Sequence, residues 1–215
     1  MKNHPAAPKA APGPEEFNFR RAGLADSGTI ASIVAEVSDG LVEELLGGLF
    51  PGLGSSDILS LAFGLGEGVY KAANVVLAED AEEPRGLLFA YPSVQQGLPA
   101  LAGKYLTPAR LTRLENVLTA SVPDTLWVNT LWVAENCRGR GLGGALLELA
   151  EGWAEQEALN GVSLYAWAAA KQSLEFYERC GFSVVRAVPA SEPPVAGRQG
   201  PHAAGGFVLA KFKSK

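Results

Sequence analysis

The sequence predicts a mixed α/β (α+β) fold in which helices flank a central β-sheet. Three observations lead to this fold class. Short apolar runs rich in β-branched and aromatic residues alternate with segments of helical periodicity from residue 16 onward. The 215 residues, 47% of them hydrophobic, are enough to bury one core and lie near the upper end of the single-domain range. No internal repeat or second-domain boundary is visible, so we expect a single domain over residues 16–215.

The first segments of the chain predict a tail, a strand and a helix. Residues 1–15 are rich in Pro and Ala and carry no periodicity, which is typical of a disordered tail. Residues 17–22 alternate in the manner of a strand. Asp26 then stands where a helix N-cap is expected. One face of the following helix is apolar and consists of Ile30, Ile33, Val34 and Val37.

The middle of the chain predicts two short helices, a hairpin, a helix and a strand. Residues 39–73 carry leucines at helical spacing, interrupted by Gly and Pro, so we expect two short, mobile helices there. Two apolar runs, 74–78 and 86–91, flank an acidic segment that indicates a hairpin loop over 79–85. Leucines share one face of a predicted helix over 107–119, and β-branched and aromatic residues predict a well-buried strand over 125–133.

The C-terminal third predicts two helices and three strands. Helical periodicity begins at Gly141, strands are expected over 162–167, 182–188 and 207–212, and Gly181 ends the second helix. The apolar stripe of the first helix consists of Leu142, Leu146, Ala150 and Trp153. The face of the second consists of Ser173, Phe176, Tyr177 and Cys180.

Composition and charge narrow the function classes. The net charge of −5 and the isoelectric point near 5.2 argue against a nucleic-acid partner, which usually requires a basic face. No apolar stretch is long enough to predict a membrane span, and no secretory signal is visible. Two cysteines do not make a disulfide framework, so we expect a reducing compartment and a cytoplasmic location.

A metal site and cysteine–histidine catalysis are not expected. His4 lies in the predicted tail and His202 in a Gly-rich loop, far from any ligand cluster in the sequence. Cys180 is expected to be a small core residue and Cys137 a loop thiol.

The segment most informative about chemistry is 131–144, where a strand leads into a glycine-dense turn and then an amphipathic helix. Glycines allow the backbone to adopt positive φ and to approach a ligand closely. Free N–H groups at a helix start, aided by the helix dipole, favour an anion. Arg138 and Arg140 add positive charge. The segment therefore predicts a phosphate-bearing cofactor held mainly by backbone.

Other phosphate sites match the segment less well. Gly139, Gly141 and Gly144 satisfy G-x-G-x-x-G, so a Rossmann-type dinucleotide-binding protein is a remote alternative. That fold requires an acidic residue at the end of the next strand, and 162–167 contains none. A Walker A loop also fails, because no Lys-Ser or Lys-Thr pair follows the glycines. A tight turn whose glycines serve packing alone is the remaining alternative.

The sequence resembles the GCN5-related N-acetyltransferase (GNAT) family in two places. Residues 138–143, Arg-Gly-Arg-Gly-Leu-Gly, are similar to the family's Arg/Gln-x-x-Gly-x-Gly/Ala pyrophosphate loop, and Val133 stands where its fourth strand ends. Residues 174–182 resemble the family's tyrosine-bearing helix, followed by Gly-Phe and the sixth strand. The order of predicted elements agrees over residues 16–213.

The resemblance implies a fold, a cofactor and a set of site residues. The fold is a mostly antiparallel sheet of six or seven strands, splayed between strands 4 and 5. The cofactor is acetyl-CoA, with main-chain groups of Leu131 and Val133 pairing with its pantetheine arm, Ser173 touching it, and Tyr177 protonating the sulfur as general acid. The pyrophosphate would be held by Arg138, Gly139, Arg140, Gly141, Leu142, Gly143 and Gly144.

The implied function is N-acetylation of a primary amine of a small molecule or protein, by direct attack on acetyl-CoA. No nucleic acid, membrane or metal is expected, and the resemblance is compatible with a homodimer. Two departures keep open a catalytically silent acyl-CoA sensor of the same fold: Ala170 stands where the family often has Asn, and Asn129 where many members have Glu. Spacing alone favours Tyr177 as a packing residue, because it shares a helical face with Phe176 and Cys180.

The sequence does not identify a general base. An unperturbed lysine-like amine has a pKa near ~10.4, so a carboxylate would help to deprotonate it. Asp124, Glu43 and Glu44 are candidates, but each fits a solvated surface charge at least as well.

Overall fold

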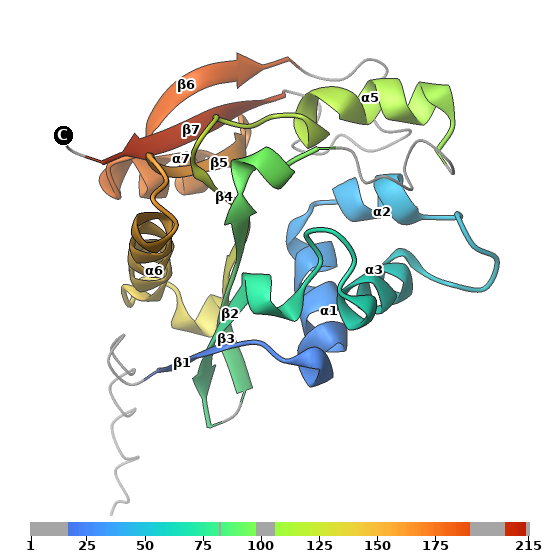
Figure 1. The fold of residues 1–215 in the computed structure, drawn as a ribbon, viewed down its shortest axis with the longest axis horizontal. Coiled ribbons are helices and arrows are strands. Elements are labelled where there is room, and N and C mark those ends of the chain that lie inside the picture. The colour runs from blue at the N-terminus through green and yellow to red at the C-terminus, as the bar shows by residue number, and fades with distance from the viewer. Residues whose placement is uncertain (1–16, 82, 98–105, 190–204, 214–215) are drawn as a thin grey trace, which may run out of the picture.

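The computed structural model describes residues 17–81, 83–97, 106–189 and 205–213. The predicted tail over 1–15, with His4, and His202 lie outside these ranges. Figure 1 shows a central sheet with α1 and α3 on one side and α6 on the other. The helices are α1 (Ser27–Val37), α2 (Leu41–Leu46), α3 (Ser55–Leu65), α5 (Pro108–Leu118), α6 (Leu142–Gln156) and α7 (Lys171–Arg179).

The sheet contains seven strands in the order β1-β2-β3-β4-β5-β7-β6. Every neighbouring pair is antiparallel except β4 and β5, which are parallel, so the predicted mixed fold with a mostly antiparallel sheet is confirmed. The strands are β1 (Asn18–Arg21), β2 (Val75–Asp80), β3 (Glu83–Pro92), β4 (Leu126–Val133), β5 (Gly161–Trp167), β6 (Ser183–Val188) and β7 (Gly206–Phe212).

The parallel pair separates after three residues. Leu126–Val128 of β4 pair with residues 162–164 of β5, whereas β4 continues to Val133 and β5 to Trp167. This is the splay between the fourth and fifth strands that the family resemblance implied. Half of β4 therefore borders an opening in the sheet, and the strand predicted as well buried is fully buried only over its first residues, with Leu131, Trp132 and Val133 partly exposed.

Alternating side chains of the strands divide the core into two layers. In β2, Val76 and Ala78 face the layer that α6 covers, and Val75 and Leu77 face the layer that α1 and α3 cover. Gly86 of β3 lets α6 approach the sheet, because a Cβ there would come within 2.9 Å of Leu146. Leu142 and Leu146 are almost fully buried in this layer, so the start of α6 is fixed firmly against the sheet.

Asp26 was predicted to cap the first helix, but its side chain belongs instead to an ion cluster with Arg20 and Glu79. Helix α1 does begin directly after Asp26, but the Asp26 side chain does not cap it. Its carboxylate accepts hydrogen bonds from the Gly23 amide at 2.7 Å and from the Arg20 guanidinium at 2.8 Å. Arg20 also donates to Glu79 of β2, at 2.6 Å. The cluster thus joins β1, β2 and the start of α1.

The β2–β3 hairpin is tighter than the predicted loop over 79–85. Both strands extend into this segment, with Glu79 opposite Pro84 and Asp80 opposite Glu83 after a register shift. Glu79 is only 8% exposed, and it is tolerated in the ladder because the Arg20 guanidinium neutralises its charge.

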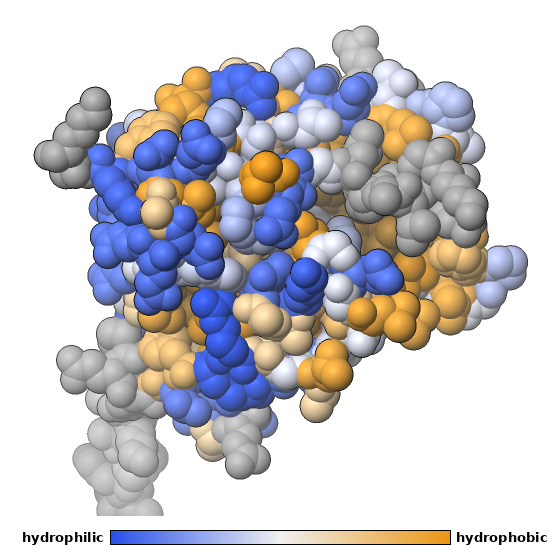
Figure 2. Space-filling model, viewed as in Figure 1, coloured by the Kyte–Doolittle hydropathy of each residue, from blue (hydrophilic) through white to orange (hydrophobic). Residues whose placement is uncertain are grey.

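Hydrophobic residues gather over α2 and α3 on the face shown in Figure 2, while the α6 side is mostly hydrophilic. Among the described residues, none of the helices is both long and apolar enough to cross a membrane.

Candidate functional site

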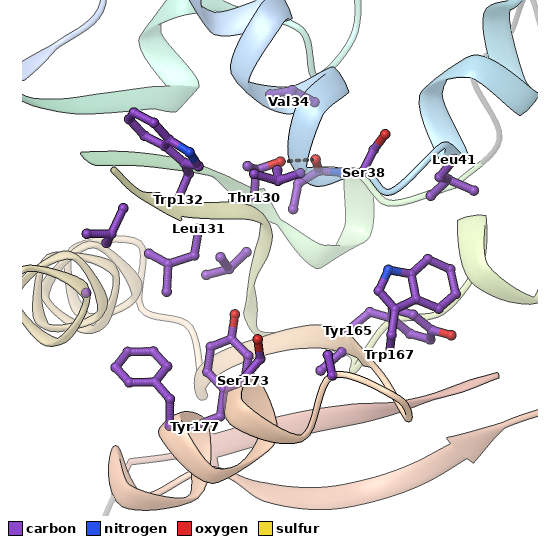
Figure 3. A pocket seen from close by; sticks show the side chains of 18 of the residues that line it. Val34, Ser38, Leu41, Thr130, Leu131, Trp132, Tyr165, Trp167, Ser173 and Tyr177 are labelled. Atoms are coloured by element: carbon purple, nitrogen blue, oxygen red, sulfur yellow. Dashed lines mark hydrogen bonds between the residues drawn. The ribbon is translucent and has the colours of Figure 1, made fainter. Parts of the chain in front are cut away.

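A cavity of about 740 Å³ passes through the opening between β4 and β5. At one end it is lined by the glycine loop, the start of α6 and one face of α7. At the other end it is lined by α1, α2 and the end of α5. Figure 3 shows Leu131 of β4 facing Ser173 and Tyr177 of α7, with Val34, Ser38 and Leu41 further along the cavity.

The glycine loop turns the chain from β4 into α6. Gly139 and Gly141 have φ of 75° and 83°, in the left-handed region that favours glycine. Gly143 and Gly144 follow in the first turn of α6. A Cβ on Gly143 would come within 3.1 Å of the Phe176 ring, so this glycine allows α6 and α7 to pack. A Cβ on Gly144 would meet nothing within 4 Å, so it would project into open space beside the loop.

The first turn of α6 offers backbone amides to a ligand. Its first intrahelical bond runs from the Ala145 amide to the Gly141 carbonyl at 3.0 Å, so the amides of Leu142, Gly143 and Gly144 precede the helical ladder. Gly141 has no side chain with which to cap them. A 15-residue helix also directs the positive end of its dipole here. This end of the cavity is therefore suited to an anion such as a diphosphate.

Arg138 borders the same end of the cavity. It is exposed, and its Nε donates a hydrogen bond of 3.2 Å to the Val133 carbonyl at the end of β4. Arg179, from the last turn of α7, is the other charged residue among the described cavity-lining residues. Both charges are positive, which reinforces the preference for an anion.

Tyr177 points its hydroxyl into the cavity beside Ser173 (Figure 3). Its ring is held by Phe176, with centroids 5.3 Å apart, and by Phe182, with centroids 5.9 Å apart. Burial raises the pKa of Tyr177 to about 12, and the negative charge of a Cys180 thiolate adds to this. Tyr177 therefore stays protonated at neutral pH.

Nearly all of the predicted site residues meet at the cavity. Arg140 does not line it, and neither do the three candidate bases: the Glu43 carboxylate instead accepts a 2.6 Å hydrogen bond from Ser55. The predicted residues that do line the cavity are Leu131, Val133, Arg138, Gly139, Gly141, Leu142, Gly143, Gly144, Ser173 and Tyr177.

Asn129 lies on the cavity wall at the end of a hydrogen-bond chain. Gln96 Nε2 donates to the Leu118 carbonyl at 3.1 Å, so Gln96 directs its Oε1 to the Tyr91 hydroxyl, which donates to it at 2.6 Å. The Tyr91 oxygen then accepts from Asn129 Nδ2 at 3.1 Å. Because a backbone carbonyl can only accept, the chain fixes the orientation of every amide in it. Asn129 Oδ1 accepts from Thr130 Oγ1 at 3.0 Å and keeps a second lone pair.

Two polar atoms of cavity-lining residues are buried and have no hydrogen-bond partner within the described part of the chain. They are the indole Nε1 of Trp127 and the hydroxyl of Tyr165. An unsatisfied buried donor costs about 1–3 kcal/mol. Less than 1 Å² of each atom is accessible, so neither atom is exposed on the cavity surface.

Sequence reasoning missed Arg179, Trp127 and Tyr165 as site residues. Arg179 shares a helical face with Phe176, and this spacing was the available signal. Trp127 and Tyr165 carry no such signal, because an aromatic residue in a strand usually indicates core packing alone.

The predicted environments of the two cysteines are reversed. Cys137 is 4% exposed, because the 3₁₀ turn Glu135–Cys137 directs it into the core. Cys180, the C-cap residue of α7, is only partly buried. No group of three or more His, Cys, Asp or Glu side chains suited to a metal ion occurs among the residues the structure describes.

Comparisons with known proteins agree with this geometry. The model of the acetyltransferase (GNAT) family matches residues 75–182, from β2 through the glycine loop and α7 to Phe182. An N-acetyltransferase from Staphylococcus aureus Mu50 has a similar fold, with a TM-score of 0.65, 18% identity and coverage of 90% of this chain and 100% of that one. A GCN5-related N-acetyltransferase from Kribbella flavida has a TM-score of 0.55 at 19% identity, with coverage of 94% and 100%. No curated protein gives a significant match.

Proposed function

Because the chain belongs to the GNAT acetyltransferase family, we propose that it transfers an acetyl group from acetyl-CoA to a primary amine of a small molecule or protein, which attacks the thioester directly. The observation that carries this proposal is one cavity that joins an anion-binding helix start, the open edge of β4 and the hydroxyl of Tyr177. We further propose that residues 16–215 form a single domain and that the two free cysteines reflect a cytoplasmic location.

The residues at the glycine-loop end fit the diphosphate of acetyl-CoA. The amides of Leu142, Gly143 and Gly144 would donate to it, and Arg138 would add a positive charge. The open space beside Gly144 is where a Cβ would intrude on a bound diphosphate. Arg140, which lies outside the cavity lining, would contribute only through its backbone.

The part of β4 that extends beyond its pairing with β5 would hold the pantetheine arm. Main-chain groups of Leu131 and Val133 face the opening where β5 has turned away, and Ser173 lies on the opposite wall. When bound, acetyl-CoA supplies an acetyl group activated as a thioester. A backbone N–H of β4 would polarise the thioester carbonyl, in the manner of an oxyanion hole.

Tyr177 would assist the departure of the sulfur. Its raised pKa of about 12 keeps the hydroxyl protonated, as a general acid requires. A free thiol has a pKa near ~8.5, so the sulfur holds a proton less tightly than Tyr177 does. Tyr177 would therefore stabilise the developing negative charge mainly as a hydrogen-bond donor that keeps its proton.

A catalytically silent acyl-CoA sensor is the second candidate, because Asn129 on the cavity wall cannot take a proton. A thermal-shift titration with acetyl-CoA tests what both candidates share: a ligand at 100 times its Kd stabilises the fold by about 2.7 kcal/mol. The absence of any shift would contradict both. The rate of free-thiol release from acetyl-CoA then distinguishes the two candidates. An acetyltransferase releases thiol faster when an amine is added, whereas a silent sensor does not.

A further inference from the structure

The part of the cavity beyond the β4–β5 opening has an apolar wall. Helices α1 and α2 supply most of it, and the end of α5 closes it. The charged residues among the described lining, Arg138 and Arg179, are cationic. The apolar side chains of this wall include Val34, Val37, Leu41, Val42, Leu45 and Leu118.

This wall favours an amine carried on an apolar body. A second ammonium group on the acceptor would lose hydration against the leucines and valines.

Asn129 favours the neutral form of the reacting amine. The chain from Leu118 through Gln96 and Tyr91 holds Nδ2 away, so the atom Asn129 can offer to an amine N–H is Oδ1. An amide oxygen accepts a hydrogen bond but adds no net charge to stabilise an ammonium ion. At pH 7 an amine with a pKa near ~7.9 is roughly 300-fold richer in its neutral form than one near ~10.4.

We propose that the acceptor is a weakly basic primary amine on an apolar body, as in the amide of an apolar α-amino acid. This inference rests on the proposed acetyl transfer. Asn129 is its specificity-determining residue, because the amine donates to Oδ1.

The test measures kcat/KM at pH 7 with acetyl-CoA and three amines. Phenylalaninamide matches the proposed acceptor, lysinamide has the same α-amino amide on a cationic side chain, and 2-phenylethylamine has the same ring but a strongly basic amine without the carbonyl. The proposal predicts that phenylalaninamide exceeds each of the others by at least ~10-fold. In Asn129→Asp the preference for phenylalaninamide over 2-phenylethylamine should fall by at least ~10-fold, because a carboxylate can bind the ammonium ion and accept its proton to release the neutral amine.

Each other outcome counts against a distinct claim. A wild-type preference for lysinamide or 2-phenylethylamine overturns this inference and leaves the acetyltransferase proposal standing. An unchanged preference in an Asn129→Asp variant that still binds acetyl-CoA removes Asn129 from the specificity role. No transfer to any amine by protein shown calorimetrically to bind acetyl-CoA contradicts the proposed function and, with it, the inference.

Discussion

Gly206 lies beneath the ring of Tyr165 so closely that a Cβ added to the glycine would overlap the tyrosine hydroxyl. The same Cβ would come within 2.5 Å of the Ala166 carbonyl oxygen, which cannot move without disturbing β5. The absence of a side chain at Gly206, at the start of β7, thus leaves the space that the Tyr165 ring occupies. We expect Gly206→Ala to lower the free energy of unfolding by about 1–3 kcal/mol, measured by urea denaturation. An unchanged value would mean that Tyr165 has other positions available.

Removal of the Tyr165 hydroxyl should not destabilise the protein. The hydroxyl is buried and lacks a partner within the described residues, so Tyr165→Phe removes an unsatisfied polar atom and keeps the ring contact with Trp167 at 4.8 Å. The free energy of unfolding without ligand should stay constant or rise by up to about 1–3 kcal/mol. A loss of 1 kcal/mol or more would show that the hydroxyl does have a partner.

Tyr177→Phe separates catalysis from packing. The substitution keeps the ring between Phe176 and Phe182 and removes only the hydroxyl. Turnover should fall by about 10²-fold, while the Kd for acetyl-CoA from calorimetry should change by less than ~3-fold. If turnover and affinity fell together, Tyr177 would be a packing or binding residue.

The Arg20 cluster predicts a loss of stability in acid. The guanidinium of Arg20 holds the pKa of Asp26 below its ordinary value of 3.8. The folded state therefore gains stability from ionised Asp26 above that value and loses it as the pH falls through the lowered pKa. The melting temperatures of wild type and Asp26→Asn should differ most above pH 5 and converge towards pH 3. A constant difference over this range would contradict the role of the charge.

The sequence predicted the glycine-loop end of the cavity better than the end lined by α1 and α2. The glycine loop can be recognised in one stretch, because Gly139 and Gly141 must adopt positive φ and the helix that follows is amphipathic. The splay between β4 and β5 and the position of Tyr177 beside the opening could be predicted only from the resemblance to the GNAT family. The local pattern alone favoured packing for Tyr177.

The remaining features depend on contacts between distant parts of the chain. Glu79 enters the β2 ladder because Arg20, 59 residues earlier, neutralises it. The orientation of Asn129 is set by Gln96 and Tyr91, which no spacing connects to it. The apolar wall of the cavity consists of leucines and valines of α1, α2 and α5, and in the sequence their periodicity indicates only a helix face. The two cysteines were assigned from their neighbours in sequence, and a single 3₁₀ turn was enough to bury Cys137.

The central claim, that the first turn of α6 binds the diphosphate of acetyl-CoA, is tested most directly by comparing two glutamates in the same helix. An added Cβ meets nothing within 4 Å at either Gly144 or Gly152. Gly144→Glu places a carboxylate in the first turn, where the helix dipole favours it, so the fold should remain stable while the charge competes with the diphosphate. Isothermal titration with acetyl-CoA should give at least ~10-fold weaker binding for Gly144→Glu and wild-type binding for Gly152→Glu. Equal affinities for the two variants would contradict the assignment.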